Sequence, residues 1–344
     1  MGILSTATAF GRHPGLAVEL RYDPHLMRIA ILGSGGVGGY FGGRLAAAGA
    51  DVTFIARGAH LQAMKDRGLR LISPEGDAVV RPVKATDDPK TAGPTDIVFF
   101  TVKLYDTDSA VRTMGPLLGP STVVVPFQNG IDAVDTLTKA AGARRVAGGT
   151  TYIVANIEEP GVIRHTALGR LIFGPLHETQ EPALQNLLQA CRTAGIDATY
   201  SDRIIADIWA KFVRLSAFSG MTTVTRRPIG TLCDDAALWA MTLGALEESM
   251  AVARAKGVPV RDRLAADIGA AMRSMPPESK SSMLLDLERG HRLELPWLSG
   301  AVVRIGKSLG VPTPTHEFIA TVLGPHVSGA SPDERAAGSA MKAY

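Results

Sequence analysis

Cysteine, long apolar runs and clusters of like charge are all scarce in this sequence. Its 344 residues include two cysteines, Cys191 and Cys233, too few and too far apart for a disulfide framework or a cysteine-based zinc site. The sequence therefore favours a reducing, cytoplasmic compartment. Cys191 falls in an amphipathic pattern, which predicts a buried free thiol. The eight histidines lack the spacing of metal ligands, so we expect no metal.

Three further classes of protein are disfavoured by what is missing. No apolar run approaches the ~20 residues of a membrane span, so we expect no membrane partner. The net charge is only +3, and Lys and Arg never gather in groups of five or six, which argues against nucleic acid and fits a small anion. No Walker-type phosphate loop is present, so ATP use has no support.

The hydrophobic period changes once along the chain, near residue 200. Before that point short β-branched runs alternate with helical stretches, which is typical of a parallel sheet. We expect a helix at 182–194, a hairpin made by the runs VIRHT and RLIFG through residues 167–169, and strands at 28–32, 52–56, 97–102, 122–127, 146–154 and 198–200. Beyond residue 202 the period is 3.6, which predicts helices at 202–219, 235–256, 262–274, 279–289, 297–309 and 315–323.

The predicted fold class is therefore α/β plus all-α. A Rossmann-type parallel-sheet domain at 27–200 precedes a helical substrate and catalytic domain at 201–326. Residues 1–26 have neither a signal-peptide core nor a strong hydrophobic period, and we expect a disordered extension there. Residues 327–344 consist mainly of small and charged residues, and we expect a flexible tail. The sequence leaves open whether the protein forms a homodimer.

A glycine-rich loop follows the first predicted strand, RIAIL. It consists of Gly33, Ser34, Gly35, Gly36, Val37 and Gly38. Gly33 allows a tight turn, Gly35 lets the backbone approach a pyrophosphate, and Gly38 lets helix and strand pack closely. The helix that follows offers free N–H groups to the phosphates. Since strand, loop, helix and second strand come in the required order, the loop predicts dinucleotide binding.

The end of the second predicted strand favours NADP over NAD. An NAD enzyme usually places a carboxylate about 20 residues past the glycines, but this chain has Ala56 and Arg57 there. The planar guanidinium of Arg57 suits a phosphate, although a solvated surface cation is the simpler interpretation. Lys103 and Asn129 follow two further strands at the edge where open sheets bind ligands. Each alone also fits a surface cation or a plain turn, but together they favour a site.

Lys211 interrupts the apolar stripe of the predicted helix at 202–219. Four apolar residues flank it at helical spacing: Ile204, Ile208, Leu215 and Phe218. Two interpretations are open. In one, the stem of Lys211 covers apolar surface while its head group pairs with Asp207. In the other, Lys211 lies in a cleft between the domains and protonates a substrate oxygen.

From Met27 to about Leu323 the chain resembles the ketopantoate reductase family, the 2-dehydropantoate 2-reductases. The motifs that carry the resemblance are GSGGVGGYFGGRLAAAG, IARG, TVKLYD, QNGID, IWAKF, SSMLLDL and ELPWLSG. The most specific are the Trp-x-Lys helix, the Ser-Met-Leu turn and the glutamate twelve residues past that serine.

The resemblance implies an oxidoreductase of pantothenate biosynthesis that reduces a small 2-keto acid, ketopantoate, to pantoate with NADPH. Lys211 would be the general acid, and Glu294, the second catalytic residue, would hold the substrate hydroxyl. Asn129 would orient nicotinamide and substrate, and Ser282 would hold the carboxylate. Such a reaction is physically coherent, since a ketone that receives a hydride also needs a proton at its oxygen.

By the same resemblance, Arg57 and Lys103 would grip the adenosine 2′-phosphate of NADP. Two alternatives remain: an opine or 3-hydroxyacid type of dehydrogenase, and a non-catalytic NADP-binding sensor on a reductase scaffold. The twelve-residue interval from Ser282 to Glu294 favours the ketopantoate group over the first. Lys211 together with Glu294 argues against the second.

The chain also departs from the family's pattern around the substrate. Leu215 and Ser219 stand where the family carries asparagines, four and eight residues after the lysine. Pro296 replaces an aspartate, and Ser299-Gly300 stands where Asn-Gly is usual. We therefore expect a less polar pocket, in which a bulkier or more apolar 2-keto acid competes with ketopantoate.

Overall fold

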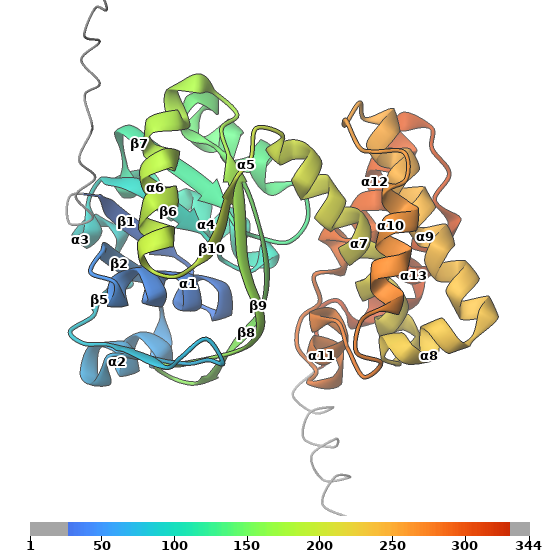
Figure 1. Cartoon of the computed structure of the whole chain (residues 1–344), viewed down its shortest axis with the longest axis horizontal. Helices are drawn as coiled ribbons and strands as arrows, with labels where there is room; N and C mark the ends of the chain where they lie inside the picture. Colours follow the sequence, from blue (N-terminus) through green and yellow to red (C-terminus); the bar gives the residue numbers. More distant parts are fainter. Residues whose placement is uncertain (1–26, 331–344) are drawn as a thin grey trace, which may run out of the picture.

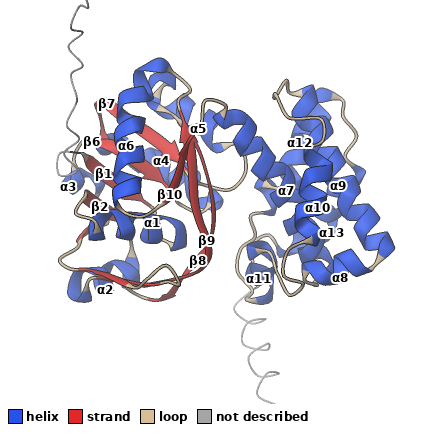
Figure 2. Ribbon diagram, viewed as in Figure 1, coloured by secondary structure: helices blue, strands red, loops and turns tan. Residues whose placement is uncertain are grey.

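The computed structural model describes residues 27–330, which form two parts joined by one long helix (Figure 1). The first part, blue to green, holds the described strands, and the second, yellow to red, is helical (Figure 2). Helix α7 (Ile204–Thr225) runs from one part into the other. The predicted fold class is confirmed. The predicted extension at 1–26 and residues 331–344 of the predicted tail lie outside the described residues.

A five-stranded parallel sheet forms the centre of the first part, with strand order β5-β2-β1-β6-β7. Its strands are β1 (Arg28–Leu32), β2 (Asp51–Ile55), β5 (Lys84–Thr86), β6 (Thr95–Phe100) and β7 (Leu118–Pro126). The sheet winds outward from β1 to β5 and then resumes on the other side of β1 with β6. At such a reversal the carboxyl ends of the strands leave a crevice, and in open α/β sheets this crevice holds the ligand.

Apolar side chains cover both faces of this sheet, as parallel sheets require. Ile29 and Ile31 of β1 face one core with helices α1 (Gly36–Ala47) and α6 (Glu181–Thr193). That core also contains Cys191, which confirms the predicted buried thiol. Ala30 and Leu32 face the opposite core, which includes residues from three other helices: α3 (Pro89–Ala92), α4 (Thr107–Thr113) and α5 (Ala133–Ala141).

A second, mixed sheet packs beside the first, and the sequence patterns had revealed only part of it. Its path is β10-β9-β3-β4, with β8 paired along β9. The strands are β3 (Leu69–Ile72), β4 (Ala78–Val80), β8 (Gly148–Glu159), β9 (Val162–Gly174) and β10 (Asp197–Tyr200). Helix α2 (Gly58–Arg67) leads into β3. Strands β3, β4 and β5 are three or four residues long, too short to show a period.

The predicted hairpin of VIRHT and RLIFG is wrong. Residues 162–174 form one strand, β9, which pairs antiparallel with β8, and the hairpin turn lies at Gly161. Near Leu168 and Gly169 the chain has positive φ (67° and 120°), and the pairing register shifts there without a reversal of direction. His165 Nε2 lies 3.1 Å from the carbonyl oxygens of both Ala167 and Leu168, and it stabilises this bulge. Bulges and turns both use glycine, so the letters alone did not separate them.

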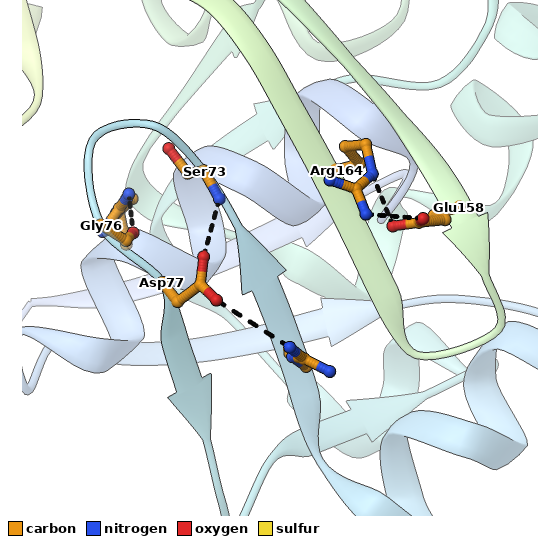
Figure 3. Close-up of polar contacts among 7 residues, drawn as sticks. Ser73, Gly76, Asp77, Glu158 and Arg164 are labelled. Carbon is orange, nitrogen blue, oxygen red and sulfur yellow. Dashed lines mark hydrogen bonds and ion pairs between the residues drawn. The ribbon is translucent and has the colours of Figure 1, made fainter.

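Polar contacts fix the turns of the β3–β4 and β8–β9 hairpins (Figure 3). The Asp77 carboxylate accepts a hydrogen bond from the Ser73 N–H at 3.0 Å and pairs with Arg70 at 3.9 Å. Arg164 binds Glu158 through two nitrogens, each 2.7 Å from a carboxylate oxygen. These pairs are exposed, so each contributes little stability, but they order the two turns.

The second part is a helical bundle around α7. Its other helices are α8 (Ile229–Asp234), α9 (Ala236–Ala255), α10 (Leu264–Arg273), α11 (Ser282–Glu288), α12 (Ser299–Leu309) and α13 (Pro314–Leu323). Residues 327–330 return to the bundle, since Leu293 N–H donates to the Val327 carbonyl and Ala330 N–H to that of Gly290. Between residues 27 and 330, no helix is long and apolar enough to cross a membrane. The same range contains no group of three His, Cys, Asp or Glu side chains that could hold a metal.

Two ion pairs connect the parts. Arg304 of α12 holds both oxygens of Asp132, at 2.6 and 2.8 Å, and Lys103 lies 3.5 Å from Asp286 of α11. Both acidic partners have less than a third of their side chain exposed. The contacts therefore set the two parts in one orientation, with a cleft between them.

Candidate active site

The glycine loop connects β1 to α1 at the carboxyl edge of the parallel sheet. Gly33 has φ +105°, and a Cβ there would meet the backbone of Thr101 and Val102 after β6. Thr101 Oγ1 also donates a 2.8 Å hydrogen bond to the Gly33 carbonyl. By contrast, a Cβ on Gly35 would meet nothing within 4 Å, because this residue faces open space. The loop is thus fixed from behind and open in front, where a ligand can approach its backbone.

Glycine is required at position 36 for a different reason, which is close packing. A Cβ there would meet the carbonyl of Ala155 in β8, so the second sheet closes directly onto the start of α1. Gly38 would meet the Gly33 carbonyl and Ile31, which confirms the predicted close packing of helix on strand. The contact with β8 was not foreseen, because it depends on the second sheet.

A cleft of about 460 Å³ begins at this loop and extends between the two parts. The predicted site residues that line it are Gly33, Ser34, Gly35, Gly36, Val37, Arg57, Lys103, Asn129, Lys211, Ser282 and Glu294. Only Gly38, which is buried behind the loop, is missing from the lining. Residues from strands, loops and helices more than 260 positions apart in sequence therefore meet in one cavity.

Arg57 and His60 lie together at the start of α2. Arg57 is exposed and is the N-terminal cap residue of the helix. His60 was not predicted: its Nδ1 accepts a 3.1 Å hydrogen bond from the Gly161 N–H, while its buried Nε2 has no partner among the described residues. Burial lowers the pKa of His60, against the effect of the Ser34 carbonyl. His60 therefore lines the cleft as a neutral imidazole.

Lys211, Asn129 and Glu294 form a buried hydrogen-bonded chain at the other end of the cleft. Lys211 Nζ donates to Asn129 Oδ1 at 2.9 Å, and Asn129 Nδ2 donates to Glu294 Oε2 at 3.1 Å. The second carboxylate oxygen of Glu294 accepts from the Leu104 N–H at 3.2 Å. Lys211 and Glu294 are only 7% and 6% exposed, so both charges are held inside the protein.

The pairing of Lys211 with Asp207, one of the two interpretations from sequence, is not what the structure has. Asp207 instead accepts a hydrogen bond from the Ser201 hydroxyl at 2.5 Å. One of the three N–H donors of Lys211 binds Asn129, and this leaves two for a ligand in the cleft.

The ammonium of Lys211 is easily lost in this environment. Burial lowers the pKa of Lys211 to about 7; repulsion by Arg214 acts in the same direction, and Glu294 opposes both. Near neutral pH both protonation states are therefore populated, which is the condition for efficient proton transfer. Perturbed lysines of this kind are concentrated at functional sites.

Lys103 lies between the two parts. Its ammonium is 3.5 Å from Asp286, and although burial acts to lower the pKa of Lys103, the carboxylates of Glu294 and Asp286 raise it overall. Its nearest charged partners thus come from the helical part. Asp286 lies in the motif SSMLLDL, but nothing in the sequence predicted that it would face Lys103.

Two adjacent serines at the start of α11 have different environments. Ser281 is buried, caps the helix by accepting from the Leu284 N–H at 3.1 Å, and also accepts from Thr222 at 2.8 Å. Ser282 is exposed to the cleft, and its hydroxyl has no hydrogen bond to another described residue. Only Ser282 is thus available to a ligand.

Comparisons with known proteins agree on one family. Residues 29–178 match the family described as "Ketopantoate reductase PanE/ApbA", and residues 203–326 match "Ketopantoate reductase PanE/ApbA C terminal". A 2-dehydropantoate 2-reductase of Mesorhizobium japonicum is 31% identical over 86% of this chain and 97% of its own length. One from Archaeoglobus fulgidus is 32% identical over 83% of this chain and 93% of its own length.

A solved structure is similar over nearly the same range. The crystal structure of a PanE/ApbA family ketopantoate reductase from Ralstonia eutropha JMP134 has a TM-score of 0.79 and 36% sequence identity. The match covers 87% of this chain and 99% of that one. Both the parallel-sheet part and the helical part are therefore shared with this relative.

Proposed function

The chain belongs to the ketopantoate reductase family, and from its cleft we propose that it reduces a small 2-keto acid to the 2-hydroxy acid with NADPH. The observation that carries the proposal is the buried chain of Lys211, Asn129 and Glu294, which lies in the same cleft as an open glycine loop. The named relatives are 2-dehydropantoate 2-reductases, so ketopantoate is the first substrate to test.

The cleft fits a dinucleotide at its glycine loop. Gly35 leaves room where a side chain would otherwise stand, and the start of α1 provides free N–H groups for a pyrophosphate. When bound, NADPH supplies the hydride. Arg57 is the cation suited to its 2′-phosphate, because no carboxylate stands at the end of β2 to bind a free ribose. Lys103 was expected at the same phosphate, but it pairs with Asp286, so Arg57 and the neighbouring His60 carry this part of the proposal.

Lys211 is the proposed general acid. A ketone that accepts a hydride develops negative charge on its oxygen, and a nearby ammonium both stabilises that charge and delivers the proton. Asn129 orients the ammonium through its Oδ1 atom. Glu294 fixes the Asn129 amide in the only orientation that satisfies both neighbours, and its charge favours the ammonium form of Lys211. The free hydroxyl of Ser282 is the proposed partner of the substrate carboxylate.

The substrate side chain is expected to be more apolar than that of ketopantoate. Leu215 and Ser219 lie on α7, one and two turns beyond Lys211, and neither offers the two-sided hydrogen bonding of an amide. Ser219 is fully buried, and its hydroxyl has no partner among the described residues. Neither residue lines the cleft, so any effect on the substrate has to act through the packing of α7, and a branched or aromatic 2-keto acid is the second candidate to test.

The test is NADPH oxidation by the purified protein with ketopantoate, pyruvate, a branched and an aromatic 2-keto acid. We expect turnover with ketopantoate and comparable turnover with a bulkier analogue. Tight NADPH binding without turnover of any 2-keto acid would instead indicate an NADP-binding sensor. A thousandfold preference for ketopantoate would show that Leu215 and Ser219 do not affect the choice.

A further inference from the structure

Arg214 is a half-buried cation that forms no ion pair with a carboxylate of residues 27–330. It lies on α7 three residues after Lys211, so the two side chains leave the same side of the helix. Its guanidinium lies over the face of Tyr152, 4.9 Å from the ring centroid. Partial burial of a charge without a counter-charge costs free energy, so we expect this guanidinium to serve a function.

The ring of Tyr152 is shared by two cations. Lys211 Nζ lies 5.8 Å from the same centroid that Arg214 approaches. Tyr152 belongs to β8 and packs against Ile204 and Ile208 of α7, so its ring is held between strand and helix. An aromatic face attracts each cation, while the two cations repel each other through a medium that screens poorly.

We infer that Arg214, held against Tyr152, sets how readily the Lys211 ammonium releases its proton. The inference rests on the proposed function, since only a proton donor needs this adjustment. Arg214 is a positioning residue here: it does not line the cleft and acts through Lys211. Burial lowers the pKa of Arg214, but a guanidinium remains charged at all ordinary pH values.

The other charged groups around Lys211 do not duplicate this role. Glu294 acts in the opposite direction and favours the ammonium. Asp207, one turn earlier on α7, is bound to Ser201. From β8, Tyr152 presents an uncharged phenol, because burial raises its pKa. Arg214 is therefore the cation that opposes Glu294 for control of the Lys211 proton.

The test is a direct titration of Lys211 by NMR in the full-length protein with isotope-labelled lysine, the signal being assigned through Lys211→Met. We expect Arg214→Gln to raise the pKa of Lys211 by roughly one unit, the lower end of the effect of a near charge. Arg214→Lys and Tyr152→Phe, which keep the cation and the ring, should stay close to the parent. Arg227→Gln removes an exposed charge beyond the end of the same helix and should change nothing.

Turnover against pH, measured on the same proteins, separates this inference from the proposed function. In Arg214→Gln the alkaline loss of turnover should move upward together with the titration. If the pKa of Lys211 rises but the pH dependence of turnover does not change, the inference is supported and Lys211 is not the general acid. If the pKa of Lys211 is unchanged in Arg214→Gln, the inference is overturned. If, in addition, KM for the keto acid rises tenfold, Arg214 is a substrate ligand instead. Arg214→Met, which keeps an apolar stem, serves if Arg214→Gln does not fold.

Discussion

Replacing Lys211 with methionine tests the site most sharply, because the change keeps the buried stem and removes only the ammonium. Lys211 is almost fully enclosed, so an apolar side chain of similar length should leave α7 packed. The residues that we assign to the cofactor, Gly35 and Arg57, lie in the other part of the molecule. NADPH binding should therefore persist, while turnover should fall by about 10²–10⁴, the usual contribution of a positioned general acid.

The pH dependence of the parent protein gives a second magnitude. With the pKa of Lys211 lowered to about 7, only about a tenth of the lysine is charged at pH 8, and about a hundredth at pH 9. Turnover should therefore fall about tenfold for each pH unit above 7. An ordinary lysine would stay charged until about pH 10 and would give a flat profile over this range.

The assay is turnover from pH 5.5 to 9.5, with cofactor binding followed by NADPH fluorescence in both proteins. Lys256→Met, a change at an exposed lysine at the end of α9, is the matched control and should behave as the parent does. Turnover above a tenth of normal in Lys211→Met, or a flat profile in the parent up to pH 9, would refute the assignment of Lys211 as the acid.

Three further changes test other parts of the cleft. Arg57→Ala should erase most of the preference for NADPH over NADH, a loss of roughly ten- to a hundredfold in NADPH affinity, and equal KM values for the two cofactors in the parent would contradict this. Gly35→Ala should weaken NADPH binding and leave the Tm unchanged. Gly36→Ala should lower the Tm, because the added methyl group meets the Ala155 carbonyl. The reverse pattern in thermal scans and fluorescence titrations would show that the two glycines were misassigned. Leu215→Asn should raise kcat/KM for ketopantoate relative to a branched 2-keto acid, and an unchanged ratio would place Leu215 outside the substrate pocket.

The sequence predicted those parts of the fold whose conformation is determined by residues close together in the chain. The run RIAIL, the glycines after it and the following helix determine one another's conformation within about 20 residues, and the structure has them as expected. The period change near residue 200 likewise predicted the helical part, although α7 extends to Thr225, six residues past the predicted end. Residues 222–225 are Thr, Thr, Val and Thr, which have low helix propensity, so the local sequence does not predict this last turn.

The partners of the site residues could not be predicted, because they come from contacts between distant segments. Nothing near Asn129 in the sequence indicates that its amide bridges Lys211 and Glu294. No motif indicates that Lys103 faces Asp286, or that Lys211 and Arg214 both lie near the ring of Tyr152. The second sheet, of which the sequence patterns revealed only part, places Tyr152 beside these two cations.

The most direct measurement of the central claim is hydride transfer itself. The protein is given ketopantoate and NADPH that carries deuterium at the transferable position of the nicotinamide, and the product is analysed by mass spectrometry. We predict a 2-hydroxy acid with one deuterium at carbon 2, formed by the parent protein and at least about a hundredfold more slowly by Lys211→Met. Consumption of NADPH without deuterium in a 2-hydroxy acid, from ketopantoate or from any bulkier 2-keto acid, would contradict the account.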